Sequence, residues 1–183
     1  LAEFYLEAPG IVGGGKDKAR AQATALAAFN PPLGDYVTGR IAEREKDKAT
    51  AERAYRAAID TSHGAAQAWL HLAQFLAHNK RLDEMEQALH TLESAPVDRP
   101  EALMDAASLL LHIGRDNALA VRFLHRYLAS PVEEGPAFKA HDLLGQVLEK
   151  QQDVHAAAEE YRAALALSHT YARARENLKR VDH

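Results

Sequence analysis

Apolar residues recur along the chain with the period of an amphipathic α-helix. They fall at positions i, i+3, i+4 and i+7, as Trp69, Leu72, Ala73 and Leu76 show, and this spacing places side chains on one helical face. Alanine, the best helix former, is abundant, whereas runs of β-branched and aromatic residues are few. The pattern therefore predicts an all-helical chain. Four segments carry it most clearly: 35–45, 65–79, 100–114 and 136–150.

A second helical segment follows each of these four, and two of the second segments match closely. "KDKATAERAYRAAIDTSH" begins at residue 46, and "QQDVHAAAEEYRAALALSH" begins at residue 151. Tyr55 in the first corresponds to Tyr161 in the second, and both segments close on Ser-His. The segments 81–96 and 115–131 have the same spacing of packing residues, but fewer of their residues are identical to those of the two matching segments. A fixed period of about 35 residues predicts stacked pairs of helices, which short loops make antiparallel.

Aspartates mark the expected starts of the second helices. Asp47, Asp83, Asp116 and Asp153 each stand there, where a carboxylate accepts hydrogen bonds from free backbone N–H groups and faces the positive end of the helix dipole. Asp83 with Glu86 adds the pattern of a capping box. We predict that these aspartates are N-caps.

These features resemble the tetratricopeptide repeat family. The unit nearest the C-terminus carries Leu144-Gly145, Ala157 and Tyr161 at the family's positions, and the unit that contains Trp69 adds Leu72 and Ala73. His63 and His169 depart from the pattern, because proline is usual there. The resemblance implies an all-α fold, a right-handed superhelical solenoid of antiparallel helix pairs with about 4.5 repeats plus a C-terminal capping helix. The expected units are 1–31 (incomplete), 32–65, 66–100, 101–137 and 138–171, followed by a capping helix at 172–183.

The family's packing assigns small and large residues to different contacts. Small residues let paired helices approach closely; here they are Ala51, Ala73, Ala120, Gly145, Ala157 and Ala164. Larger residues are expected to fill the space between units: Tyr55, Trp69, Leu72, Leu89, Leu110, Leu124, Leu144 and Tyr161. The expected core is therefore continuous from one unit to the next.

The resemblance also implies where a partner binds. First helices line the inner, concave face, which in this family holds an extended peptide or a helix of a partner protein. The residues expected to point outward from the first helices are Tyr36, Arg40, Glu43, Leu70, His71, Gln74, His78, Asp105, His112, Lys139, Asp142, Gln146 and Glu149. The set of Lys and Asn residues with which some family members clamp chaperone tails is missing, so that ligand is not expected.

A glycine-rich stretch near the N-terminus partly matches a phosphate-binding loop. Gly10, Gly15 and Lys16 have the required spacing, but Asp17 stands where the motif needs Ser or Thr. Asp17 would place a negative charge beside the phosphates. We therefore expect a turn between a helix ending near Glu7 and a helix that Asp17 caps, and no nucleotide cofactor. Contact of the turn with an anionic group of a partner stays an open alternative.

Composition narrows the function further. The 183 residues include no cysteine, which excludes disulfides, thiolate metal sites and a cysteine nucleophile. The net charge of −4 and the pI of about 6.2 argue against non-specific nucleic-acid binding, and no apolar stretch is long enough to span a membrane. The chain begins at Leu1, so we expect a segment upstream. The compartment stays open between cytoplasm and periplasm, with a bacterial helper protein favoured.

Catalytic and metal sites are not expected. His71 and His78 lie seven residues apart, a span of about 10 Å along a helix, too far to bind one ion even with His112 nearby. No Ser-His-Asp order, carboxylate pair or H-E-x-x-H motif is present. The sequence therefore predicts a scaffold that binds a protein or peptide. The alternative is a structural module that packs against other domains or self-associates without a peptide ligand.

Overall fold

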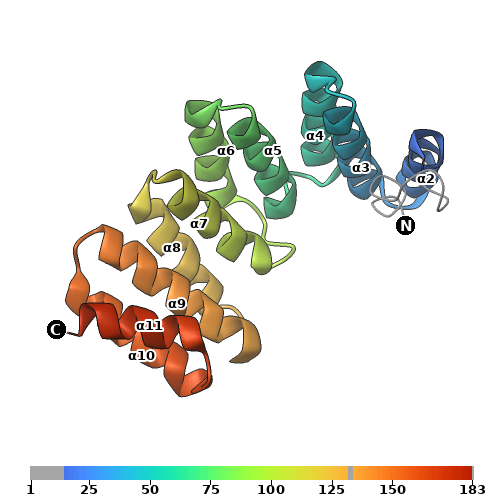
Figure 1. Ribbon diagram of the computed structural model, residues 1–183. Helices are drawn as coiled ribbons and strands as arrows, with labels where there is room; N and C mark the ends of the chain where they lie inside the picture. The colour runs from blue at the N-terminus through green and yellow to red at the C-terminus, as the bar shows by residue number, and fades with distance from the viewer. Residues whose placement is uncertain (1–14, 132–133, 183) are drawn as a thin grey trace. The chain divides into compact units, whose positions relative to one another are not determined.

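The computed structural model describes residues 15–131 and 134–182. All regular structure in these ranges is α-helical, so the all-α prediction is confirmed for them (Figure 1). The helix predicted before Glu7 and the turn between Gly10 and Gly14 lie outside the described residues. No described helix combines the length and the apolar character needed to cross a bilayer. The helices are α2 Lys16–Phe29, α3 Pro31–Arg44, α4 Lys48–Thr61, α5 Ala66–His78, α6 Leu82–Ser94, α7 Glu101–Ile113, α8 Asn117–Leu128, α9 Glu134–Lys150, α10 Val154–Leu167 and α11 Ala172–Val181.

The chain divides into two compact units, with the boundary between Asp98 and Arg99. In the first unit, α3 packs against α4 and α5 against α6, while α2 lies on α3. In the second unit, α7 packs against α8, α9 packs against α10, and α11 covers α10 and part of α9. Loops of a few residues join the members of each pair, so the two helices of a pair run antiparallel (Figure 1).

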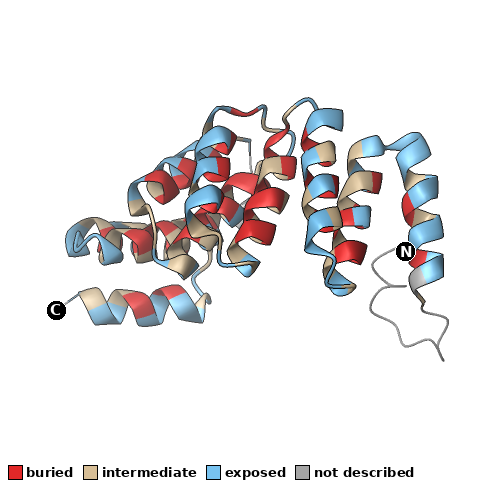
Figure 2. Cartoon of the chain, turned by 90° about the horizontal axis from the view of Figure 1, so that it is seen from above, coloured by how far each residue is buried: buried red, intermediate tan, exposed pale blue. Residues whose placement is uncertain are grey.

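Each unit has its own buried side chains on the faces that its helices turn toward one another (Figure 2). In the first unit Tyr55, Leu72 and Leu89 are at most 1% exposed, and in the second Leu124 and Tyr161 are fully buried. Among the large residues predicted to fill the core, Trp69 differs, because it stays partly exposed. The small residues predicted at helix contacts are all buried: Ala51, Ala73, Ala120, Gly145, Ala157 and Ala164.

The similarity of the two matching segments extends to their packing. A Cβ added to Gly39 would lie 2.8 Å from the ring of Tyr55, and one added to Gly145 would lie 2.5 Å from the ring of Tyr161. In both places a glycine of the first helix therefore lets a tyrosine ring of the second helix lie against its backbone. The 106-residue offset between the tyrosines equals that between the glycines, so the same joint is built in both units.

Three of the predicted caps are confirmed. Asp47 accepts a hydrogen bond from Thr50 N at 3.0 Å, Asp116 from Leu119 N at 2.9 Å, and Asp153 from Ala156 N at 3.0 Å. Each bond satisfies a backbone donor that the first helical turn leaves free.

The predictions for Asp17 and Asp83 as caps are wrong. Both residues lie inside the first turn, and the N-cap positions belong to Gly15 and Arg81, neither of which makes a side-chain cap bond. Asp83 therefore does not occupy the N-cap position that the predicted capping box with Glu86 requires. The two carboxylates retain a favourable position near the positive helix end.

Candidate functional site

The first unit has a hollow of about 330 Å³ on the side of its first helices. Helices α3 and α5 supply most of the lining, and one tyrosine of α4 and its aromatic neighbour on α5 form the floor. Six of the seven residues that the sequence predicted to point outward from this unit's first helices meet here, and Leu70 is the exception. The lining residues are Tyr36, Arg40, Glu43, Arg44, Tyr55, His71, Gln74, Phe75 and His78.

A stacked pair of rings forms one wall of the hollow. The ring of Tyr36 on α3 lies 4.0 Å from that of His71 on α5, with 26° between the planes. Arg40 Nη1 donates a hydrogen bond to the Tyr36 hydroxyl at 2.9 Å, and its guanidinium lies 5.9 Å from the ring centre. Gln67 Nε2 lies 2.9 Å from His71 Nε2. These contacts hold the aromatic wall in one arrangement while leaving both rings partly exposed.

The floor of the hollow is aromatic and carries one carboxylate. The Tyr55 hydroxyl donates to Glu43 Oε2 at 2.5 Å, and His78 Nδ1 lies 3.8 Å from Glu43 Oε1. Burial, and then the neighbouring Glu43, raise the pKa of Tyr55, so the phenol stays protonated and keeps donating. The ring centres of Tyr55 and Phe75 are 5.5 Å apart.

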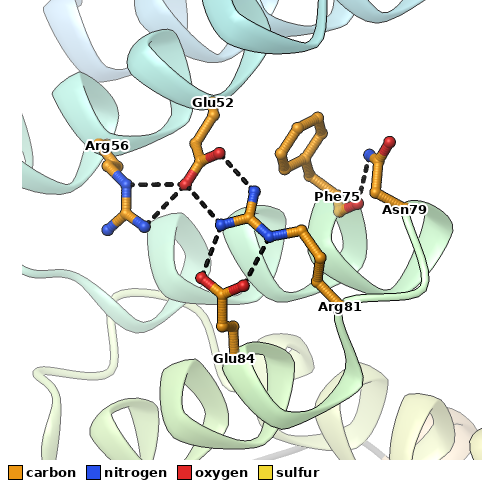
Figure 3. A network of polar contacts seen from close by, with 6 residues as sticks. All are labelled: Glu52, Arg56, Phe75, Asn79, Arg81 and Glu84. Carbon is orange, nitrogen blue, oxygen red and sulfur yellow. Dashed lines mark hydrogen bonds and ion pairs between the residues drawn. The ribbon is translucent and has the colours of Figure 1, made fainter.

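An ion-pair network holds the two second helices of this unit together. Figure 3 shows Arg81 between Glu52 of α4 and Glu84 of α6, bound to both carboxylates. Arg56 binds the same Glu52 at 2.8 Å. Hydrogen bonding to Arg81 lowers the pKa of Glu52 and of Glu84. The network links the start of α6 to α4, and α4 supplies Tyr55 to the floor of the hollow.

The outward orientation predicted for Leu70 is wrong. Leu70 is 0% exposed, because α5 is apolar around most of its circumference and packs on more than one side. A helix of this composition presents buried residues on several faces, so periodicity alone could not separate its inner from its outer positions. Leu70 therefore belongs to the core of the first unit.

The outward orientation predicted for Asp142 is also wrong. Asp142 is 1% exposed and lies under α11, where Asn177 Nδ2 donates to it at 2.9 Å and Arg173 Nε lies 3.2 Å away. Gln146 Nε2 and the Tyr171 hydroxyl complete its partners, at 2.9 and 3.4 Å. Burial raises the pKa of Asp142, and the bond from Asn177 opposes that rise. This residue fastens the last helix.

A second hollow, of about 420 Å³, lies in the second unit. Gln146, Glu149 and Lys150 of α9 line it together with Leu111 of α7 and Arg180 of α11. Arg180 binds Glu149 with two hydrogen bonds of 2.9 and 2.8 Å, and the Tyr161 hydroxyl donates to the same carboxylate at 2.8 Å. Glu149 thus matches Glu43 of the first unit, with an arginine of α11 as its additional partner.

The remaining predicted site residues of the second unit are Asp105, His112 and Lys139. All three are exposed, and they do not line the second hollow. The Lys139 ammonium lies 5.8 Å from the centre of the Phe138 ring. The structure therefore brings the predicted residues of the first unit together, apart from Leu70, whereas in the second unit only Gln146 and Glu149 line a common hollow.

Sequence reasoning missed the polar groups of the last helix. Arg173, Asn177 and Arg180 project from α11 onto α9, although the sequence predicted only a polar cap for this segment. Their equivalents 106 residues earlier are Gln67, His71 and Gln74, so extending the repeat match by one helix would have indicated them. No group of three or more metal-binding side chains converges in the described ranges.

Comparisons with known proteins agree with this arrangement. The tetratricopeptide repeat profile matches residues 138–171, which hold most of α9 and all of α10. No curated protein sequence matches the chain. Solved structures do match. YrrB, described as a TPR protein with an unusual peptide-binding site, has a TM-score of 0.63 and 13% identity over 90% of this chain and 84% of its own.

Two other solved structures have the same fold in different assemblies. A chain of the APC/C hetero-tetramer Cut9–Hcn1 matches 91% of this chain with a TM-score of 0.57 and 16% identity, and this chain spans 33% of it. The human IFIT1 dimer with m7Gppp-AAAA matches 92% with a TM-score of 0.53 and 17% identity, and this chain spans 42% of it. At such identities these structures show the fold alone. The chain carries a tetratricopeptide repeat at residues 138–171 and has the fold of tetratricopeptide repeat proteins.

Proposed function

We propose that this chain is a scaffold that binds a peptide or a segment of a partner protein in the hollow of its first unit. The observation that carries the proposal is the meeting of Tyr36, Arg40 and His71 in that hollow. Tyrosine and arginine dominate the energetics of protein interfaces, because they combine a large contact area with directional hydrogen bonding. A volume of about 330 Å³ suits one or two side chains of an extended peptide.

The rigidity of the hollow supports this role. Tyr36 is already stacked and Arg40 already hydrogen-bonded before any partner arrives, so binding costs little side-chain entropy. The peptide-binding site described for YrrB supports a peptide ligand by analogy. We further propose that the pairs α3–α4, α5–α6, α7–α8 and α9–α10 are four successive repeats of one interaction scaffold.

A protein partner is favoured over a nucleic acid, and the role is proposed as non-catalytic. The chain has a net charge of −4, whereas nucleic-acid binding depends on a positively charged surface. Acid–base catalysis requires groups that converge on a reacting atom, and the acidic group of this hollow, Glu43, is engaged by Tyr55.

The test is a selection from a displayed library of random peptides on the immobilised protein, followed by titration of the selected peptides. We expect Arg40→Glu to weaken binding about tenfold, since it removes a charge-assisted donor. Arg53→Glu is the matched control, because Arg53 is exposed on α4 and does not line the hollow. A library that yields no binder, or binders that respond equally to both substitutions, would refute the proposal.

Assembly without a peptide ligand is the second candidate, and the N-terminal part of the first unit favours it. Phe29 at the end of α2 is 91% exposed and Leu33 in α3 is 41% exposed, and exposed apolar side chains are common at protein interfaces. Light scattering distinguishes the two functions. A dimer that Phe29→Ser converts to a monomer supports assembly, whereas a monomer at all concentrations excludes self-association.

A further inference from the structure

The two hollows are built from equivalent positions of the chain. Four of the five residues that line the hollow of the second unit lie 106 residues after residues that line the hollow of the first. The pairs are Arg40 and Gln146, Glu43 and Glu149, Arg44 and Lys150, and Gln74 and Arg180. The floor repeats as well, because the hydroxyl of Tyr161 donates to the glutamate of the second hollow as that of Tyr55 does in the first. The second hollow is therefore the same site built again, three helix pairs further along the chain.

The walls of the two hollows differ in chemistry. The stack of Tyr36 on His71 forms the aromatic wall of the first hollow. The equivalent positions of the second unit hold Asp142 and Asn177, which are buried and joined by a hydrogen bond of 2.9 Å. The half-buried Leu111 of α7 supplies an apolar wall there instead. The second hollow therefore suits a charged group on an aliphatic stem better than an aromatic ring.

The one carboxylate of the second hollow is already engaged within the protein. Glu149 accepts two hydrogen bonds from Arg180, at 2.9 and 2.8 Å, and one from the Tyr161 hydroxyl at 2.8 Å. Hydrogen bonding to Arg180 lowers the pKa of Glu149, so the carboxylate stays ionised and keeps these donors at neutral pH. A cationic ligand would have to compete with Arg180 for the same oxygens.

Lys150 brings a positive charge that no contact neutralises. Its side chain is exposed at the end of α9, and its ammonium makes no hydrogen bond and no ion pair with the residues that the structure describes. Arg180 gives two of the five N–H groups of a guanidinium to Glu149. The lining therefore carries one more positive than negative charge, in a chain whose net charge is −4. This excess favours an anion.

We propose that the hollow of the second unit binds the carboxylate of an acidic side chain, aspartate or glutamate, of a protein partner. The Lys150 ammonium donates to this carboxylate, Arg180 adds one of its other N–H groups, and the methylene groups of the ligand lie against Leu111. The inference rests on the proposed scaffold function, since it treats the equivalent hollow of the first unit as a binding site. It adds a second site, which shares no residue with the first.

The charge and the apolar wall distinguish this ligand from other anions. A phosphate group carries nearly two negative charges, and Glu149 would repel the second of them. The carboxylate of a side chain is separated from the peptide backbone by methylene groups, which can contact Leu111. A carboxylate at a chain end would instead bring a polar peptide group against this apolar side chain, which is unfavourable.

The test is a titration of the isotope-labelled full chain with the dipeptide Leu-Glu, acetylated and amidated at its ends, followed by amide chemical shifts. The blocked dipeptide Leu-Gln, at matched ionic strength, is the neutral control probe. Blocked leucyl-phosphoserine and acetylated Leu-Leu with a free C-terminus test the two competing anions. We expect saturable shifts at the amides of 111, 146–150 and 180 with Leu-Glu, and none with Leu-Gln.

Lys150→Gln tests the donor on which the site depends most. It removes one charge from an exposed position, so we expect binding of Leu-Glu about tenfold weaker, as for loss of a charge-assisted hydrogen bond, with the thermal midpoint unchanged. Lys179→Gln is the matched control, because it removes the same charge from an exposed position of α11 that does not line the hollow. It should leave the affinity unchanged.

Three results would overturn the inference. They are equal shifts with Leu-Gln, equal affinities for Leu-Glu in Lys150→Gln and Lys179→Gln, and saturation by either competing anion at lower concentration than by Leu-Glu. The proposed function is tested apart from this. Peptides selected on the first hollow report on Arg40, whereas the amides of 146–150 report on the second hollow, so either site can fail while the other binds.

Discussion

The ring of Tyr161 lies against the backbone of Gly145, with no room for a side chain between them. A Cβ at Gly145 would be 2.5 Å from Tyr161 Cε1, closer than carbon atoms approach without displacement. Inside a helix, alanine is otherwise favoured over glycine by about 1 kcal/mol. We expect Gly145→Ala to lower the free energy of unfolding by about 1–3 kcal/mol, because displacement of the buried ring outweighs the helix preference. Urea unfolding followed by circular dichroism measures the change.

Lys150→Ala, at an exposed position of the same helix, is the control for Gly145→Ala and should change stability little. If both proteins unfolded at the same urea concentration, the close contact between Gly145 and Tyr161 would be wrong. The same experiment applies to Gly39 and Tyr55 in the first unit, where the effect should have the same sign.

Ala157 tests the close approach of α9 and α10. It is 0% exposed, so Ala157→Leu must force extra carbon atoms into a filled space. We expect a loss of about 1–3 kcal/mol in the free energy of unfolding. His155→Leu adds leucine at an exposed position of α10 and should leave the thermal midpoint nearly unchanged. Equal midpoints for the two variants would contradict the packing.

The fold was predictable because each unit repeats the same local rules. The 3.6-residue period indicated the helices, and the aspartates at 47, 116 and 153 indicated three helix starts through a single hydrogen bond each. Asp83 failed as a cap because Arg81 occupies that position and is bound to Glu52 and Glu84. A tertiary ion pair of this kind has no signature in a local sequence window.

The candidate site was predictable only in part. Tyr36, Arg40 and His71 were identified because they share one face of their helices, which periodicity reveals. Leu70 and Asp142 were placed wrongly because burial on two sides depends on the neighbouring helix.

Arg81 should stabilise the first unit in a pH-dependent way. Its bonds lower the pKa of Glu52 and of Glu84, so their contribution is present above the unfolded-state carboxyl pKa and is lost as the pH falls through the lower folded-state value. We expect Arg81→Met to cost roughly 1 kcal/mol at pH 7, allowing for solvent screening. The cost should shrink below about pH 4, where carboxyl groups begin to protonate.

Urea unfolding at pH 7 and pH 3 measures the effect of Arg81→Met, with Arg53→Met as control. Arg53 is exposed on α4 and hydrogen-bonds only to the Thr50 hydroxyl among the contacts found for it. A cost for Arg81→Met that is the same at both pH values would show that the methylene stem of the side chain, and not its charge, stabilises the unit.

Asp105 should have the opposite pH dependence. Although Asp105 is exposed at the surface, partial desolvation by the surrounding protein and then the charge of Glu101 raise its pKa in the folded protein. The favourable contribution is therefore complete below the unfolded-state value and is lost as the pH rises through the folded-state value. At pH 7 the ionised Asp105 therefore destabilises the fold, and Asp105→Asn should raise the thermal midpoint. At pH 3 the wild-type group is largely protonated, so the gain should nearly vanish.

Glu176→Gln, which changes an exposed carboxylate of α11, should show no such dependence of the thermal midpoint on pH. A lower midpoint for Asp105→Asn at pH 7 would mean that the carboxylate stabilises the start of α7, for example through the helix dipole, and that its repulsion with Glu101 is the smaller effect.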